Sequence, residues 1–127
     1  MRAEDTPCMK RAYLLDEKES VEVRLWSPSL TGDEYETWAC EHQIIGLGDE
    51  KRRTVYGGDA VQAVYLSLIN IATTLYCSEE YQKGRLRWSG ASPKFDLALP
   101  VADSIQDSVS QQILDLDKRF AESLQDR

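Results

Sequence analysis

The sequence has few of the residues that build metal sites, disulfides and histidine-dependent active sites. It contains one histidine and three cysteines, Cys8, Cys40 and Cys77. A disulfide-stapled secreted domain has an even number of cysteines in a shorter chain, and a zinc site usually begins with a C-x-x-C pair, which this sequence lacks. We therefore expect buried or half-buried free thiols in a reducing cytosol, with neither a metal nor a cofactor.

Long apolar runs are also missing. No stretch approaches the ~18 uninterrupted apolar residues of a transmembrane helix, and the densest segment, residues 61–75, is interrupted by Gln62, Ser67 and Asn70. The first five residues, MRAED, contain acids where a signal peptide has an apolar run. We expect a cytoplasmic protein that is neither exported nor inserted in a membrane.

Basic side chains are outnumbered. The chain has 15 Lys and Arg against 22 Asp and Glu, a net charge of −7 and an isoelectric point of about 4.7. Binding to a nucleic-acid backbone depends on clustered basic side chains, so this composition argues against a DNA or RNA partner. A negative field instead favours encounters with basic proteins.

The composition is sufficient for one hydrophobic core. Of 127 residues, 42% are hydrophobic, and a division into two domains would leave pieces too small to hold cores. We predict a single α+β domain over residues 1–127, in which residues 1–8 form a loose lead-in.

The first half of the chain alternates as strands do. We expect strands at residues 10–15, at the alternating Val21, Val23 and Leu25, at 35–45 and, more briefly, at 53–56. Turns are expected at residues 16–19, 27–33 and 46–49. Together these segments predict an antiparallel β-meander with one solvated face.

A long helix is predicted over residues 59–77, where Asp59 and Gln62 have the spacing of a capping box. Its apolar residues recur at steps of three and four and predict one wide face that covers the sheet: Val61, Val64, Tyr65, Leu68, Ala72, Leu75 and Tyr76. Strands are then expected near Leu86 and Trp88 and over residues 95–99.

The end of the chain, residues 103–127, is predicted to form a second amphipathic helix. Its apolar stripe is narrow and consists of Ile105, Val109, Ile113, Leu116, Phe120 and Leu124. Such a stripe either docks on its own domain or meets a partner helix, as in a homodimer.

The block YGGDAVQAV at residues 56–64 resembles the signature of a family of short bacterial proteins of unknown function. In that family a Gly-x-Asp-Ala-x-Gln-Ala segment follows several strands and leads into an apolar helix. The resemblance continues with a Trp-x-Cys strand at Trp38 and Cys40 and a Phe-x-Leu-x-Leu-Pro-Val strand at residues 95–101, and it covers roughly residues 10–107. It implies this fold and a bacterial origin, and it carries no activity.

No catalytic residues are assigned. His42 lies between Cys40 and Ile44 on the apolar face of a predicted strand, which favours a core histidine over a general base. A Cys40–His42 nucleophile pair would lack a third residue to orient the imidazole. The Gly46-x-Gly48 turn followed by residues 51–53, KRR, could form a local anion patch, but it lacks the features of a phosphate-binding loop.

Several residues are candidates for binding a partner. Trp26 falls on the polar face of its strand, where it is either covered by the chain's own helix or exposed as an interface anchor, whereas Trp38 and Trp88 are expected in the core. The acidic candidates lie in predicted loops and helix ends: Asp33, Glu34, Glu36, Glu79 and Glu80.

These features favour a non-enzymatic binding protein of the bacterial immunity or antitoxin type. An acidic protein of this kind would associate rapidly with a basic toxin domain and occlude its active site. Two alternatives remain: a structural subunit that self-associates through its last helix, and a small enzyme with an unfamiliar site around His42.

Overall fold

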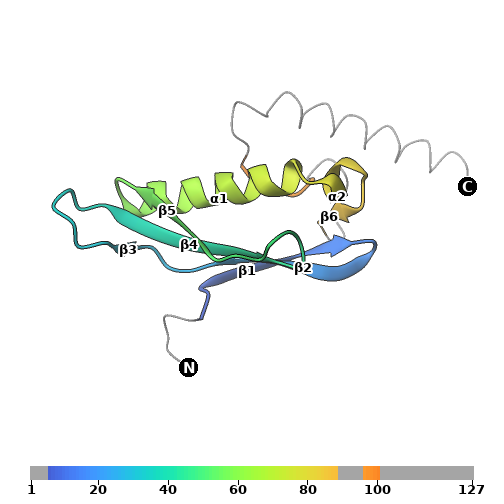
Figure 1. Cartoon of the computed structure of the whole chain (residues 1–127), viewed down its shortest axis with the longest axis horizontal. Helices are drawn as coiled ribbons and strands as arrows, with labels where there is room; N and C mark the ends of the chain where they lie inside the picture. Colours follow the sequence, from blue (N-terminus) through green and yellow to red (C-terminus); the bar gives the residue numbers. More distant parts are fainter. Residues whose placement is uncertain (1–5, 89–95, 101–127) are drawn as a thin grey trace, which may run out of the picture.

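The computed structural model of the chain describes residues 6–88 and 96–100, and it shows an α+β fold (Figure 1). In this part of the chain, one long helix lies along one face of a sheet of six antiparallel strands. The predicted fold class is confirmed. The predicted helix over residues 103–127 and most of the predicted lead-in lie outside the described residues.

The sheet begins with a tight hairpin. β1 (Met9–Leu15) and β2 (Lys18–Leu25) are joined at Asp16 and Glu17, which both have positive φ, 54° and 68°. Two such residues form the connection whose twist matches that of the paired strands. The predicted turn over residues 16–19 is therefore shorter than expected, because Lys18 and Glu19 already belong to β2.

β4 (Trp38–Ile45) is central to the sheet. One edge pairs with β2 and with the two-residue β3 (Ser29–Leu30), and the other edge pairs with β5 (Arg53–Gly57). The other edge of β2 pairs with β1, and the other edge of β1 pairs with β6 (Leu86–Arg87). The strand expected over residues 35–45 begins only at Trp38, so residues 35–37 belong to a loop.

The alternation predicted for β2 and β4 is present in the structure. Val21, Val23 and Leu25 are buried, as are Cys40 and Ile44, and these side chains form the core with residues of the helix. Trp38 and Trp88 are partly buried and pack against this core.

The long helix α1 (Ala60–Tyr76) follows β5 directly and begins as predicted. The Asp59 carboxylate accepts a hydrogen bond from the Gln62 backbone N–H at 2.7 Å, and Gln62 Oε1 accepts one from the Gly58 N–H at 2.6 Å. Gly57 lies so close to the first turn that an added Cβ would be 2.5 Å from the Ala63 nitrogen. These contacts explain why a Gly-Gly-Asp block precedes the helix.

The face of α1 that packs on the sheet differs from the predicted one. The buried residues of the helix are Ala63, Ser67, Ile71, Ala72, Leu75 and Tyr76, whereas Val61 is 77% exposed and Tyr65 is 52% exposed. The small Ala63 and Ser67 allow the helix to approach the sheet closely, and larger side chains at these positions would hold it away. The prediction that Val61 and Tyr65 face the sheet was wrong.

The chain after α1 makes a second, one-turn helix, α2 (Glu79–Gln82), capped by Ser78. The strand predicted over residues 95–99 is not formed within residues 96–100, because Asp96 and Ala98 have positive φ and interrupt the extended backbone. Side chains hold this segment instead. Tyr13 donates to the Leu97 carbonyl at 2.8 Å, and Tyr81 donates to Asp96 Oδ2 at 2.9 Å.

Neither α1 nor α2 is long and apolar enough to cross a membrane.

Cys40 is buried, but Cys8 and Cys77 are exposed free thiols, so the expectation that all three would be at least half-buried was wrong for these two.

Candidate functional site

The most prominent polar feature is the loop between β3 and β4, residues 31–37, which we call the acidic loop. It contains Asp33, Glu34 and Glu36, all exposed, and it projects from one end of the sheet (Figure 1). At its centre Tyr35 is 79% exposed, and no large hydrophobic residue in the described part of the chain is more exposed. Sequence reasoning missed Tyr35 because the strand was expected to include it.

The acidic loop is closed by its own hydrogen bonds. Thr31 N–H donates to the Thr37 carbonyl at 2.9 Å, and Thr37 N–H donates to Asp33 Oδ1 at 2.9 Å. Hydrogen bonds from Thr37 hold the pKa of Asp33 below its ordinary value, so this carboxylate remains charged. No ion pair within residues 6–88 and 96–100 involves Asp33, Glu34 or Glu36. The loop therefore presents a pre-formed negative surface around one tyrosine.

The other acidic candidates, Glu79 and Glu80, are in the first turn of α2. Figure 1 shows α2 at the end of the molecule opposite to the acidic loop. Glu79 forms an ion pair with Lys83 one turn later. The structure thus does not bring the two acidic groups into one surface.

Trp26 is buried, with 7% of its surface exposed, but it lies outside the main core. Its backbone N–H donates to the Glu41 carbonyl, and the Arg52 guanidinium lies 3.7 Å from its ring centroid while also pairing with Glu41. Because the neighbouring His42 faces α1, Glu41 and Trp26 face the other side of the sheet. Arg52 therefore covers the Trp26 ring. The ring is not covered by α1, and it is not exposed as an interface anchor.

His42 is a core residue. Only 2% of its surface is exposed, its Nε2 lies 3.4 Å from the Asn70 amide nitrogen on α1, and its Nδ1 has no hydrogen-bond partner in the described part of the chain. Burial, together with the charge of Arg53, lowers the pKa of the ring below its ordinary value. The imidazole is thus neutral near pH 7, and no carboxylate within the described ranges orients it.

The predicted anion patch lies beside His42, at a cavity of about 250 Å³. Its lining includes Gly48, Lys51 and Arg53, but Arg53 forms an ion pair with Asp49 at 2.7 Å. Arg52 pairs with Glu41 on the other side of the sheet. Two of the three cations in the KRR block are therefore already engaged by carboxylates of the chain.

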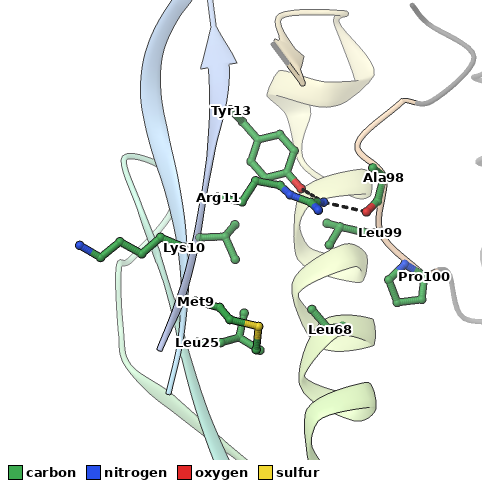
Figure 2. Close-up of a pocket in the computed structure, with 10 residues that line it drawn as sticks. Met9, Lys10, Arg11, Tyr13, Leu25, Leu68, Ala98, Leu99 and Pro100 are labelled. Carbon is green, nitrogen blue, oxygen red and sulfur yellow. Dashed lines mark hydrogen bonds between the residues drawn. The ribbon is translucent and has the colours of Figure 1, made fainter. Parts of the chain in front are cut away.

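A more apolar groove lies between β1 and α1 (Figure 2). Its volume is about 270 Å³, and Figure 2 shows Met9 and Leu25 on one wall, Leu68 opposite them, and Leu99 and Pro100 beside Leu68. The apolar walls fit a hydrophobic side chain better than a polar metabolite.

Arg11 lies at one end of this groove. Arg11 donates to the Ala98 carbonyl at 2.7 Å and lies 4.7 Å from the Trp88 ring centroid. These contacts tie Arg11 to segment 96–100, which closes one side of the groove.

A buried cluster of tyrosines and one acid anchors segment 96–100. Tyr76 and Tyr81 meet edge to face at 4.9 Å between ring centroids, and Tyr81 donates to the Asp96 carboxylate. Burial raises the pKa of Asp96 and of both tyrosines, and the nearby carboxylate raises the pKa of the tyrosines further. The cluster acts as a structural anchor, because its polar atoms are directed at one another inside the fold.

Within residues 6–88 and 96–100, no three His, Cys, Asp or Glu side chains are grouped to hold a metal ion.

A family model matches most of the chain. The family is described as a domain of unknown function, DUF6968, and the match covers residues 9–101, which include every described strand and helix. No curated protein and no solved structure matches the chain.

Proposed function

Because the chain belongs to the DUF6968 family of domains of unknown function, we propose its function from its own surfaces: it binds and neutralises another protein without catalysing a reaction. The protein is of the immunity or antitoxin type, and its acidic loop enters the active-site cleft of a toxic effector. The observation that carries this proposal is Tyr35, exposed between Glu34 and Glu36 on a hydrogen-bonded loop.

The chemistry of the acidic loop selects a basic partner. Aromatic residues dominate the binding energy of many interfaces when they fill a pocket on the partner. Carboxylates around such an anchor complement a cleft that binds phosphate, as in a nuclease, and they occupy it without being substrates. The loop is already closed by internal hydrogen bonds, so binding costs little ordering of the backbone.

The proposal also includes the setting of the protein. We place it in the bacterial cytoplasm, and we propose that the Gly-x-Asp-Ala-x-Gln-Ala helix start characterises its family. Tyr35 replaces Trp26 as the aromatic anchor, since Trp26 lies under Arg52. Glu79 and Glu80 take part only if the partner extends to the far end of the molecule.

Capture of the partner and rescue from its toxicity test this proposal together. The tagged chain is expressed in its native host, and proteins that co-purify with it are identified by mass spectrometry. The captured protein, induced alone in cells without the chain, is expected to arrest growth, and co-expression of the wild-type chain is expected to restore it.

Matched variants assign the contact to the acidic loop. Tyr35→Ala is expected to weaken binding roughly 30-fold, as for a central interface residue, and to reduce rescue. Tyr56→Ala removes another exposed tyrosine, on β5, and is expected to bind like the wild type. A chain that purifies alone, a captured protein that is harmless, or equal binding by wild type and Tyr35→Ala would contradict the proposal.

A further inference from the structure

One face of α1 carries an apolar surface that is open to solvent. Val61 and Tyr65 are exposed on it, whereas Val64 and Leu68 are partly buried and also pack against the core, and we call these four residues the outer stripe of α1. With Pro28 and Ala60 they line a shallow groove that is almost entirely apolar.

The composition of α1 indicates that this surface is covered by another element. The helix sequence AVQAVYLSLINIATTLY contains no charged residue in 17 positions. A helix on a solvated surface carries charged or polar residues on its outward face, whereas the outer stripe of α1 is formed by apolar side chains. We therefore expect another element to cover the outer stripe.

The path of the chain points to the occupant. Leu68 of the outer stripe also lines the groove between β1 and α1, whose wall includes Leu99 and Pro100 (Figure 2). The two apolar grooves thus share Leu68. Pro100 is the last described residue, so the rest of the chain starts beside the middle of α1.

The remaining segment has the right pattern and length. Residues 103–127 carry a stripe of six apolar residues at helical spacing, from Ile105 to Leu124. As a helix these 25 residues would be about 37 Å long, against about 25 Å for the 17 residues of α1. The segment can therefore run along the whole outer stripe.

We propose that residues 103–127 dock as an amphipathic helix on the outer stripe of α1 within the same chain, with the groove beside Pro100 receiving its first apolar side chains. An attached segment meets its site at an effective concentration of the order of millimolar, which favours this arrangement over a second copy. The arrangement makes α1 a central helix between the sheet and its own C-terminal helix, and it does not depend on the function proposed above.

Hydrogen exchange followed by mass spectrometry on the full chain tests the docking. In a monomeric wild-type protein, amides of residues 103–127 are expected to exchange slowly. Val61→Asp and Tyr65→Asp place a charge on the outer stripe and are expected to speed exchange in this segment about tenfold or more. Thr74→Asp, an exposed position of α1 on the side opposite Tyr65, is the matched control and should leave that exchange unchanged.

A reciprocal variant distinguishes loss of docking from misfolding of α1. Leu116→Asp changes the segment itself, so it should speed exchange in residues 103–127 while amides of β4 remain protected. Light scattering on each sample gives the oligomeric state. Rapid exchange of residues 103–127 in the wild type would overturn the proposal, as would protection that Val61→Asp and Tyr65→Asp leave intact. Protection that disappears when a dimer dissociates would instead assign the surface to a second copy.

Discussion

At the scale of single residues, burial governs the chemistry of His42 and Asp96. Both side chains are enclosed, and desolvation disfavours the charged form of each. The pKa of the His42 imidazole is therefore lowered, and the pKa of the Asp96 carboxyl is raised. Their effects on stability have opposite dependence on pH.

The stability of the protein should fall when the pH drops through the titration range of histidine. The unfolded state binds a proton to His42 below about pH 6.5, whereas the folded state resists it, so protonation favours unfolding. The loss begins as the pH falls below that value and continues until the pH reaches the lower pKa of the folded state. It amounts to about 1.4 kcal/mol for each unit between the two pKa values.

Urea unfolding of the wild type and His42→Gln between pH 8 and 5, followed by tryptophan fluorescence, measures this loss. The wild type should lose more unfolding free energy than the variant over this range. Asp96 titrates in both proteins with the opposite sign, since its raised pKa makes the fold lose stability as the pH rises from about 4, and the comparison removes its contribution. Parallel pH profiles would show that His42 is not the group responsible.

At the scale of elements, the junction between β5 and α1 combines several local signals. Asp59 and Gln62 cap the helix, and Gly57 allows the strand to end against the first helical turn. The start of the helix followed from the cap, and its packing face did not. Periodicity favoured the larger apolar residues Val61 and Tyr65, but the close approach to the sheet requires the small Ala63 and Ser67.

Gly57→Ala should destabilise the protein by about 1–3 kcal/mol, the usual cost of overpacking a closely packed site. The added Cβ would lie 2.5 Å from the Ala63 nitrogen and 2.9 Å from its Cα, and backbone atoms of a helix cannot move aside cheaply. Gly58→Ala is the matched control, because its Cβ would meet only the end of the Gln62 side chain at 3.3 Å. Thermal unfolding compares the two variants, and equal losses would contradict this account of the junction.

At the scale of the whole molecule, the two groups of acidic residues proposed to bind a partner lie far apart. The net charge of −7 gives the chain a negative field, yet the acidic loop and α2 lie at opposite ends of it. The acidic loop combines an exposed aromatic residue with acids that form no ion pair within the described residues, whereas Glu79 of α2 is paired with Lys83. A partner that depends on both features should recognise that end.

Association with the captured partner should therefore depend on salt and on which end carries the charge. The wild-type on-rate should fall about tenfold or more as salt rises from 0.05 to 0.5 M, because screening removes steering by the field. Glu34→Gln with Glu36→Gln should lower the low-salt on-rate several-fold. Glu79→Gln with Glu80→Gln removes the same charge at the opposite end and should have little effect. Stopped-flow kinetics would contradict the assignment if both double variants slowed association equally.

The sequence by itself determined the α+β class, the hairpin and meander strands, the α1 cap and the acidity, because alternation, helix caps and charge are local properties. His42 as a core residue also followed from the strand period. Tertiary structure decided the rest: Trp26 is covered by an arginine from the β4–β5 connection, Tyr35 is released into a loop, and segment 96–100 is held by tyrosines from β1 and α2. These outcomes depend on which side chains distant in the sequence meet, and local patterns of the sequence do not determine those contacts.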